Sequence, residues 1–148
     1  MKTLTILGFD PGRDKCGVAI MNTQLITVYH QVIDSAQAIA ILEQLAAQYA
    51  VDLVVIGDGT TSTAWRQQIE SRLSQVPVMT VDETNSTLEA RDRYWLMYPP
   101  RRWQRLVPQS LRVPPRPVDD IVAILLIERY LNQAHNARDV AQDHQQLE

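Results

Sequence analysis

The hydrophobic period of this chain changes near residue 34, and this change constrains the fold most strongly. Residues 3–9, 17–21 and 25–33 are apolar or alternate between apolar and polar side chains, with short turn sequences between them. This pattern predicts three consecutive strands in an antiparallel meander. Beyond residue 34, segments with helical spacing alternate with short apolar runs. Such alternation is typical of βαβ units with parallel strands.

The remaining elements follow from the same periodicities. The predicted helices cover residues 35–49, 61–74, 84–95 and 118–132, and the predicted strands cover residues 52–57 and 76–81. Ser35 is the candidate N-cap of the first helix. The predicted fold class is α/β, with one mixed five-stranded sheet whose three antiparallel strands precede a parallel βαβ continuation, flanked by helices.

With 148 residues, the chain is long enough for one domain with a real core, which we expect over residues 1–133. Residues 98–117 hold six of the eight prolines and are predicted to form an irregular loop rich in Pro and Arg. Residues 134–148 are expected to be a polar, frayed C-terminal tail. The single Cys16 excludes an internal disulfide. No segment resembles a membrane span or a signal peptide, so we expect a cytoplasmic protein that does not bind membranes.

Charge is distributed very unevenly along the chain. The net charge is −3, yet the segment from Arg91 to Arg116 contains seven arginines and one acid, Asp92, which gives +6 and leaves −9 for the rest. Four aromatic residues lie among these arginines: Tyr94, Trp95, Tyr98 and Trp103. Arginine binds phosphate in a bidentate manner and aromatic rings stack on unpaired bases, so the segment indicates a nucleic-acid-binding surface. The alternatives are a solvated loop whose tryptophans fill the core, or an interface with a second copy.

Acidic residues follow three of the predicted strands and open the last predicted helix. These residues are Asp10, Asp58, Asp82, Glu83, Asp119 and Asp120. In α/β sheets, functional groups gather at the carboxyl ends of strands. Carboxylates that meet there repel one another, which raises their pKa unless a cation lies among them. Mg²⁺ or Mn²⁺ is the natural companion, because each takes oxygen ligands and can promote phosphodiester cleavage.

Each acid also has a simpler structural interpretation. An Asp before Pro-Gly, such as Asp10, is often a turn residue that bonds to the local backbone. Acids such as Glu83, Asp119 and Asp120 are favoured in the first turn of a helix by the helix dipole. Asp120 is the weaker candidate of the final pair.

Three local motifs, in order, carry a family resemblance. They are Phe-Asp-Pro-Gly-Arg-Asp-Lys-Cys-Gly-Val-Ala at 9–19, Asp-Glu-Thr-Asn-Ser-Thr-Leu-Glu-Ala-Arg at 82–91, and the Asp-led aliphatic helix at 118–131. Together with the element order over residues 3–131, they resemble the YqgF-type (RuvX-like) family within the RNase H-like nuclease superfamily. That family comprises Holliday-junction resolvases and pre-16S rRNA processing nucleases.

The resemblance implies a divalent-metal-dependent endonuclease that hydrolyses phosphodiester bonds in structured RNA or branched DNA. Carried over position by position, Asp10, Glu83 and Asp119 would be both the catalytic residues and the ligands of Mg²⁺ or Mn²⁺. A junction resolvase would need two active sites and hence a homodimer. The residues expected to contact phosphates are Lys15, Arg91, Arg101, Arg102 and Arg105.

Two departures from the family pattern leave alternatives open. After the fourth predicted strand the chain has Gly-Asp-Gly-Thr-Thr at 57–61, and RuvC-type relatives carry an acid near this place, so Asp58 rivals Glu83 as the second ligand. RuvC-type enzymes also carry two acids three apart on the last helix, whereas this chain has Val122. A catalytically inactive nucleic-acid-binding protein is therefore one alternative. A second is an ATP-binding relative with the same Asp-x-Gly hairpin, although such proteins need a further domain.

Overall fold

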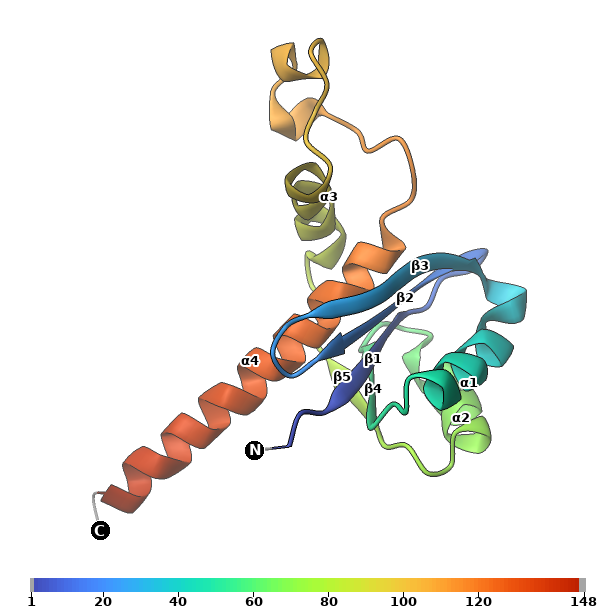
Figure 1. Cartoon of the computed structure of the whole chain (residues 1–148), viewed down its shortest axis with the longest axis vertical. Helices are drawn as coiled ribbons and strands as arrows, with labels where there is room; N and C mark the ends of the chain where they lie inside the picture. The colour runs from blue at the N-terminus through green and yellow to red at the C-terminus, as the bar shows by residue number, and fades with distance from the viewer. Residues whose placement is uncertain (1, 147–148) are drawn as a thin grey trace.

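A computed structural model describes residues 2–146, which form a mixed five-stranded sheet between two layers of helices (Figure 1). The strands are β1 (Thr5–Asp10), β2 (Lys15–Asn22), β3 (Thr27–Asp34), β4 (Leu53–Gly57) and β5 (Val78–Val81). Their order in the sheet is β3-β2-β1-β4-β5. The strands β1, β2 and β3 pair antiparallel, and β4 and β5 continue from β1 in parallel. The sheet predicted from periodicity is confirmed.

Helices cover both faces of the sheet. The helices are α1 (Ala38–Gln48), α2 (Ser62–Arg72), α3 (Ser86–Met97) and α4 (Asp119–Gln146). The α1 and α2 helices pack on one face, and α4 crosses the other face with α3 beside it. Adjacent β1 residues accordingly enter different cores: Ile6 faces α4, and Leu7 faces α1 and α2. A strand buried on both faces must be apolar where it is buried, as β1 is from Ile6 to Phe9.

The last helix lies very close to the centre of the sheet. A Cβ added to Gly8 would lie 2.4 Å from the backbone oxygen of Ala123. Only a residue without a side chain can therefore occupy this position of β1 while α4 keeps its place. The close approach holds the N-terminal end of α4 above the strand ends.

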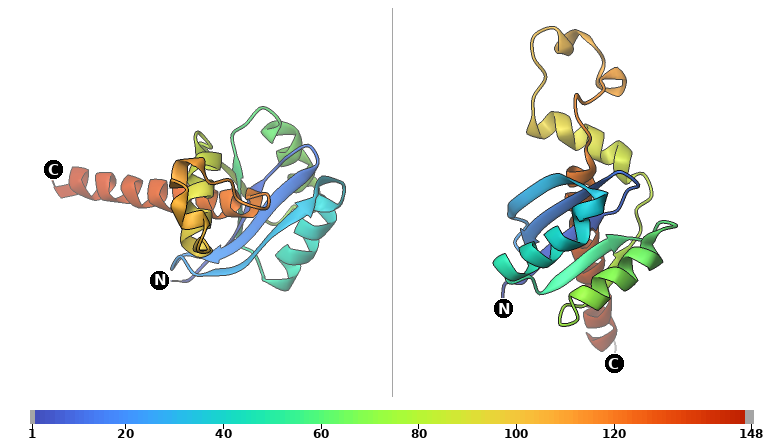
Figure 2. Two further views of the ribbon diagram at one scale, coloured as in Figure 1. Left: turned by 90° about the horizontal axis from the view of Figure 1, so that it is seen from above. Right: turned by 90° about the vertical axis from the view of Figure 1, so that its right-hand side faces the viewer.

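The segment 98–117, here called the arm, projects beyond the sheet and its helices, as Figure 2 shows. Its regular structure consists of two short 3-10 turns, Gln104–Leu106 and Gln109–Leu111, which agrees with the irregular loop expected from its prolines. None of the helices in the described part of the chain is both long and apolar enough to cross a membrane.

Two local expectations differ from the structure. The Ser35 hydroxyl caps no helix; it donates to the Gly12 carbonyl oxygen at 2.9 Å and so braces the β1–β2 turn. The final helix does not stop near residue 132 but continues to Gln146, through most of the segment expected to be a frayed tail. Alanine and glutamine recur there, and their good helix propensity lets the helix continue beyond its packed first half. Residues 147–148 of that expected tail lie outside the described residues.

Candidate active site

Asp10 and Asp119 meet at the carboxyl edge of the sheet. Asp10 ends β1, and Asp119 opens α4. Their carboxyl groups form a hydrogen bond, and Asp10 is paired in register with Gly17 of β2. Burial, followed by the charges of Asp119 and Glu83, raises the pKa of Asp10 to about 8. Burial also raises the pKa of Asp119, against the opposing hydrogen bond from Asp10. At neutral pH the two groups hold a proton between them unless a cation replaces it.

Glu83 approaches the same edge from the segment after β5. Its carboxylate lies against Gly57 and Gly59, where an added Cβ would come within 2.2 Å and 2.1 Å of its oxygens. Burial, and then the charges of Asp58 and Asp82, raises the pKa of Glu83. The two glycines therefore leave the space that this carboxylate occupies.

Asp58 and Glu83, which compete for the second ligand position in the sequence, are neighbours in the structure. The backbone N–H of Glu83 donates to Oδ1 of Asp58 at 3.3 Å, and the backbone N–H of Asp58 donates to Val81 at 3.0 Å. The strand ends of β4 and β5 thus present two carboxylates side by side. The structure therefore places both candidates for the second ligand position at the same strand ends.

Asp120, by contrast, is committed to a structural network. Its side chain is 2% exposed. It contacts Nδ1 of His30 at 2.7 Å and accepts two hydrogen bonds from Arg116, at 2.9 Å and 3.3 Å. Burial by itself would raise the pKa of Asp120, but the Arg116 and His30 hydrogen bonds outweigh it and lower the pKa. This carboxylate joins α4 to β3 and to the end of the arm.

The acidic site fits a hard divalent cation by its chemistry. Its donors are carboxylate oxygens, which Mg²⁺ and Mn²⁺ prefer, and the pKa of Asp10 is raised by the other two acids of the predicted set. Within residues 2–146, no three His, Cys, Asp or Glu side chains already stand in a metal-binding arrangement. The proton shared by Asp10 and Asp119 reduces the repulsion between their carboxylates. A bound cation would reduce the same repulsion.

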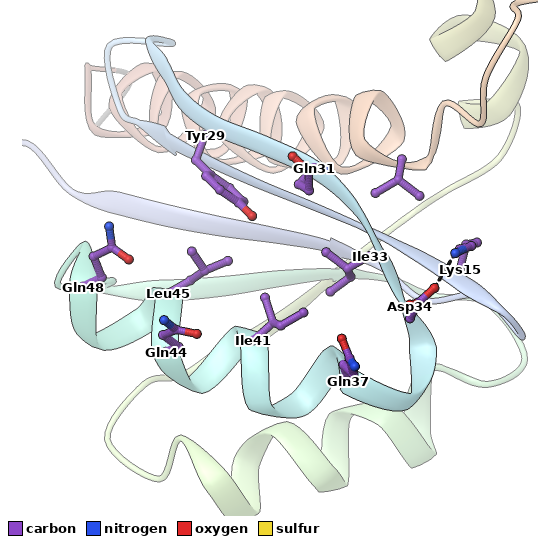
Figure 3. A pocket seen from close by; sticks show the side chains of 11 residues that line it. Lys15, Tyr29, Gln31, Ile33, Asp34, Gln37, Ile41, Gln44, Leu45 and Gln48 are labelled. Atoms are coloured by element: carbon purple, nitrogen blue, oxygen red, sulfur yellow. Dashed lines mark hydrogen bonds and ion pairs between the residues drawn. The ribbon is translucent and has the colours of Figure 1, made fainter.

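Lys15 lies at the start of β2, where its ammonium group forms an ion pair with Asp34 of β3. These two residues close one end of a hollow between β3 and α1, and Figure 3 shows the pair beside Ile33 and Gln37. None of the clustered acids lines this hollow. A phosphate contact by Lys15 would therefore have to compete with Asp34.

The seven arginines of the basic segment divide into two groups. Three are engaged within the protein. Arg93 forms two hydrogen bonds with Glu128, at 2.7 Å and 2.8 Å, and Arg116 holds Asp120. Arg112 donates to two arm carbonyls and lies 5.9 Å from the ring centre of Trp95.

The other four arginines of the segment are exposed, and none forms an ion pair with an acid in the described part of the chain. They are Arg91, Arg101, Arg102 and Arg105. The charge pattern of the sequence could not separate these two groups of arginines. Which arginine forms an ion pair depends on acids that can lie far away in the chain, as Glu128 does from Arg93. Arg105 donates from Nε to the Pro100 carbonyl oxygen at 3.4 Å, but no carboxylate neutralises its charge.

The mixed sheet, with acids at the carboxyl edge of β1, β4 and β5 and at the start of α4, defines an RNase H-like fold. The structure is similar to RuvC from Thermus thermophilus in complex with a Holliday junction substrate, with a TM-score of 0.56 and 15% identity over 91% of this chain and 95% of that chain. A second Thermus thermophilus RuvC structure gives a TM-score of 0.56 and 14% identity, covering 91% and 96%. At this identity the likeness concerns the fold.

The family model described as RuvX, Holliday junction resolvase, matches residues 4–133. The chain belongs to the RuvX family of Holliday junction resolvases. The resemblance of the three sequence motifs is thereby confirmed, and membership of this family classes the protein as a nuclease. The search of curated proteins found no match.

Proposed function

We propose that this nuclease cleaves branched DNA with the help of a divalent cation, using Asp10, Glu83 and Asp119 as its ligands and catalytic residues. The observation that carries the proposal is the meeting of Asp10 and Asp119 at the strand ends, where burial raises both pKa values and the charges of Asp119 and Glu83 raise that of Asp10 further. Perturbed carboxylates from separate elements are typical of functional sites. Asp58 lies beside Glu83 and would contribute to the same site.

When bound, Mg²⁺ or Mn²⁺ would lower the pKa of a water molecule and neutralise charge that develops on the phosphate. The protein's own groups orient the reaction. Asp10 and Asp119 would hold the cation on one side of the site once they have released their shared proton. Glu83 faces them from the β5 end. Exposed arm arginines would hold the flanking phosphates, so that water can attack phosphorus in line with the leaving oxygen.

The test is cleavage of a labelled synthetic four-way DNA junction with Mn²⁺ or Mg²⁺, and with a chelator. We expect Asp10→Asn to abolish cleavage while retaining junction binding. The matched control is Asp14→Asn, since Asp14 lies exposed in the same turn and its charge is not among the causes that raise the pKa of Asp10. Equal cleavage by Asp10→Asn and wild type, or full activity in chelator, would reject the assignment.

We further propose that two copies act on one junction, because symmetric cleavage cuts two strands. Sedimentation of the protein with and without junction tests this. A labelled pre-rRNA fragment, run beside the junction, tests whether structured RNA is cut as well. If the RNA is cleaved in preference to the junction, the same site would act in rRNA processing.

A further inference from the structure

A second candidate site lies at the arm, away from the acidic residues. We propose that a hollow between the end of α3 and the arm accepts one unpaired nucleobase of the bound nucleic acid, stacked against Trp103. This proposal rests on the proposed function and names a feature of the substrate that the acidic residues do not contact. Figure 1 shows the arm standing beyond the end of α3.

The walls of the hollow suit a flat ring. Trp95 of α3 and Trp103 of the arm supply aromatic surface, and the arm's aliphatic side chains Val107, Leu111 and Val113 close the remaining sides. The volume is about 270 Å³. Pockets for drug-sized ligands begin at roughly 300 Å³, so the hollow matches a single ring system. Trp103 is 69% exposed, so its ring is accessible for stacking.

The polar groups at the hollow favour a base over an aliphatic side chain. Gln104 uses its Oε1 to accept from the backbone of Arg101 at 2.8 Å, which leaves its amide hydrogens as donors. The polar side chains that line the hollow, Gln104 and Arg112, both carry N–H donors, and bases offer carbonyl and ring-nitrogen acceptors.

Charge around Trp103 fits the backbone of a nucleic-acid strand. Arg101, Arg102 and Arg105 flank it in the sequence, are exposed and have no acidic partner in the described chain. Phosphates on either side of a stacked base would meet these cations. A symmetric dimer formed through the arm would instead bring the same arginines face to face, which like-charge repulsion opposes. These observations favour nucleic acid as the occupant over a second copy.

The experiment compares two oligonucleotides of equal charge: an oligothymidylate of about 12 nucleotides and an abasic strand of the same length. Both present the same phosphates, and only the first presents bases. For the full chain, Trp103→Ala is expected to weaken oligothymidylate binding about 5- to 150-fold, the effect typical of losing one stacked base, and to leave abasic binding unchanged. Trp103→Phe, which keeps an aromatic face, should retain most of the affinity.

The matched control is Leu106→Ala. Leu106 lies on the same arm, is 86% exposed and lines neither this hollow nor the adjoining one. The Leu106→Ala variant should bind both oligonucleotides as tightly as the wild type does. The proposal is overturned if Trp103→Ala binds both strands normally, or if Leu106→Ala is equally weakened. It is also overturned if Trp103→Ala dissociates a dimer in sedimentation, because the arm would then be a protein interface. Failure of junction cleavage by the wild type would reject the proposed function and leave the base-dependent binding measurable.

Discussion

Gly17 of β2 lies so close to Asp119 that an added Cβ would be 1.8 Å from the Asp119 backbone oxygen. Gly17 is also the register partner of Asp10 across the β1–β2 pair. The absence of a side chain at this one position therefore allows the start of α4 to settle on the hairpin and brings two acids from opposite ends of the chain together.

Gly17→Ala should lose both stability and cleavage. The obstructing atoms are backbone atoms of α4 and cannot rotate away, so the helix start must shift. We expect a loss on the order of 3 kcal/mol in unfolding free energy and separation of Asp119 from Asp10. Denaturant unfolding and junction cleavage check this. Wild-type values in both assays would contradict the close packing of α4 on β2.

Gly59→Ala should lose activity while keeping most of its stability. Here the nearest atom to an added Cβ is a carboxylate oxygen of Glu83, the far end of a flexible side chain. Gly59 also has no positive φ, so alanine fits the backbone. Glu83 would turn away at a cost below about 1 kcal/mol, and cleavage should fall at least about tenfold. Gly17→Ala is the comparison. If Gly59→Ala loses as much stability as Gly17→Ala, the two glycines share one role and the prediction is wrong.

The stability of the metal-free protein should fall as pH rises from about 4 to about 8. The pKa of Asp10 is raised from 3.8 to about 8, so between these values the folded protein holds a proton that the unfolded chain has released. Each such group lowers the unfolding free energy by up to about 1.4 kcal/mol per pH unit. Asp10→Asn removes this contribution. In chelator, its melting temperature should exceed that of the wild type by a margin that grows with pH, whereas Asp14→Asn should follow the wild type. A margin independent of pH would refute the raised pKa.

The adjacent acids Asp119 and Asp120 should respond in opposite ways to replacement by asparagine. Asp119→Asn should abolish cleavage and leave stability unchanged or higher, because burial already disfavours its charge. Asp120→Asn weakens charge-assisted bonds to Arg116 and His30 and should cost about 2 kcal/mol. Thermal unfolding and cleavage of both variants measure the contrast. The assignment of roles would be reversed if Asp120→Asn alone lost cleavage at full stability.

Arg91 and Arg93 should separate binding from stability. Arg93 is half-buried and joins α3 to α4 through Glu128, so Arg93→Ala should cost about 1 kcal/mol in unfolding free energy. Arg91 is exposed without an acidic partner in the described chain, so Arg91→Ala should leave stability unchanged. It should weaken junction binding and reduce the slope of log affinity against log salt by about 1. An unchanged salt slope would place Arg91 outside the phosphate contacts.

The sheet and its helices could be predicted because their signals are local. Alternation of period two and helical spacing each extend over a few neighbouring residues, and the turn residues between them mark the boundaries. The end of α4 could not be predicted in this way, because no single residue near 132 stops the helix. Its extent depends on the packed first half, from which the exposed part propagates.

The candidate site was predictable only in part. That acids follow strands is visible in the sequence, and the topology of parallel strands brings those ends to one edge. The different roles of Asp119 and Asp120 are not visible, since one step along a helix turns a side chain by about 100° and only the packing of α4 says which way each faces. The same holds for the basic segment, where Glu128 and Asp120 take two of the arginines.

By itself, then, the sequence determined the order of the elements, the parallel and antiparallel halves of the sheet and the acids available at its edge, because these follow from short-range periodicity. Only the tertiary structure decided which acids share a proton, which arginines remain free and where a hollow opens beside Trp95. Those outcomes depend on contacts between residues far apart in the chain, and such contacts exist only once the two faces of the sheet are covered.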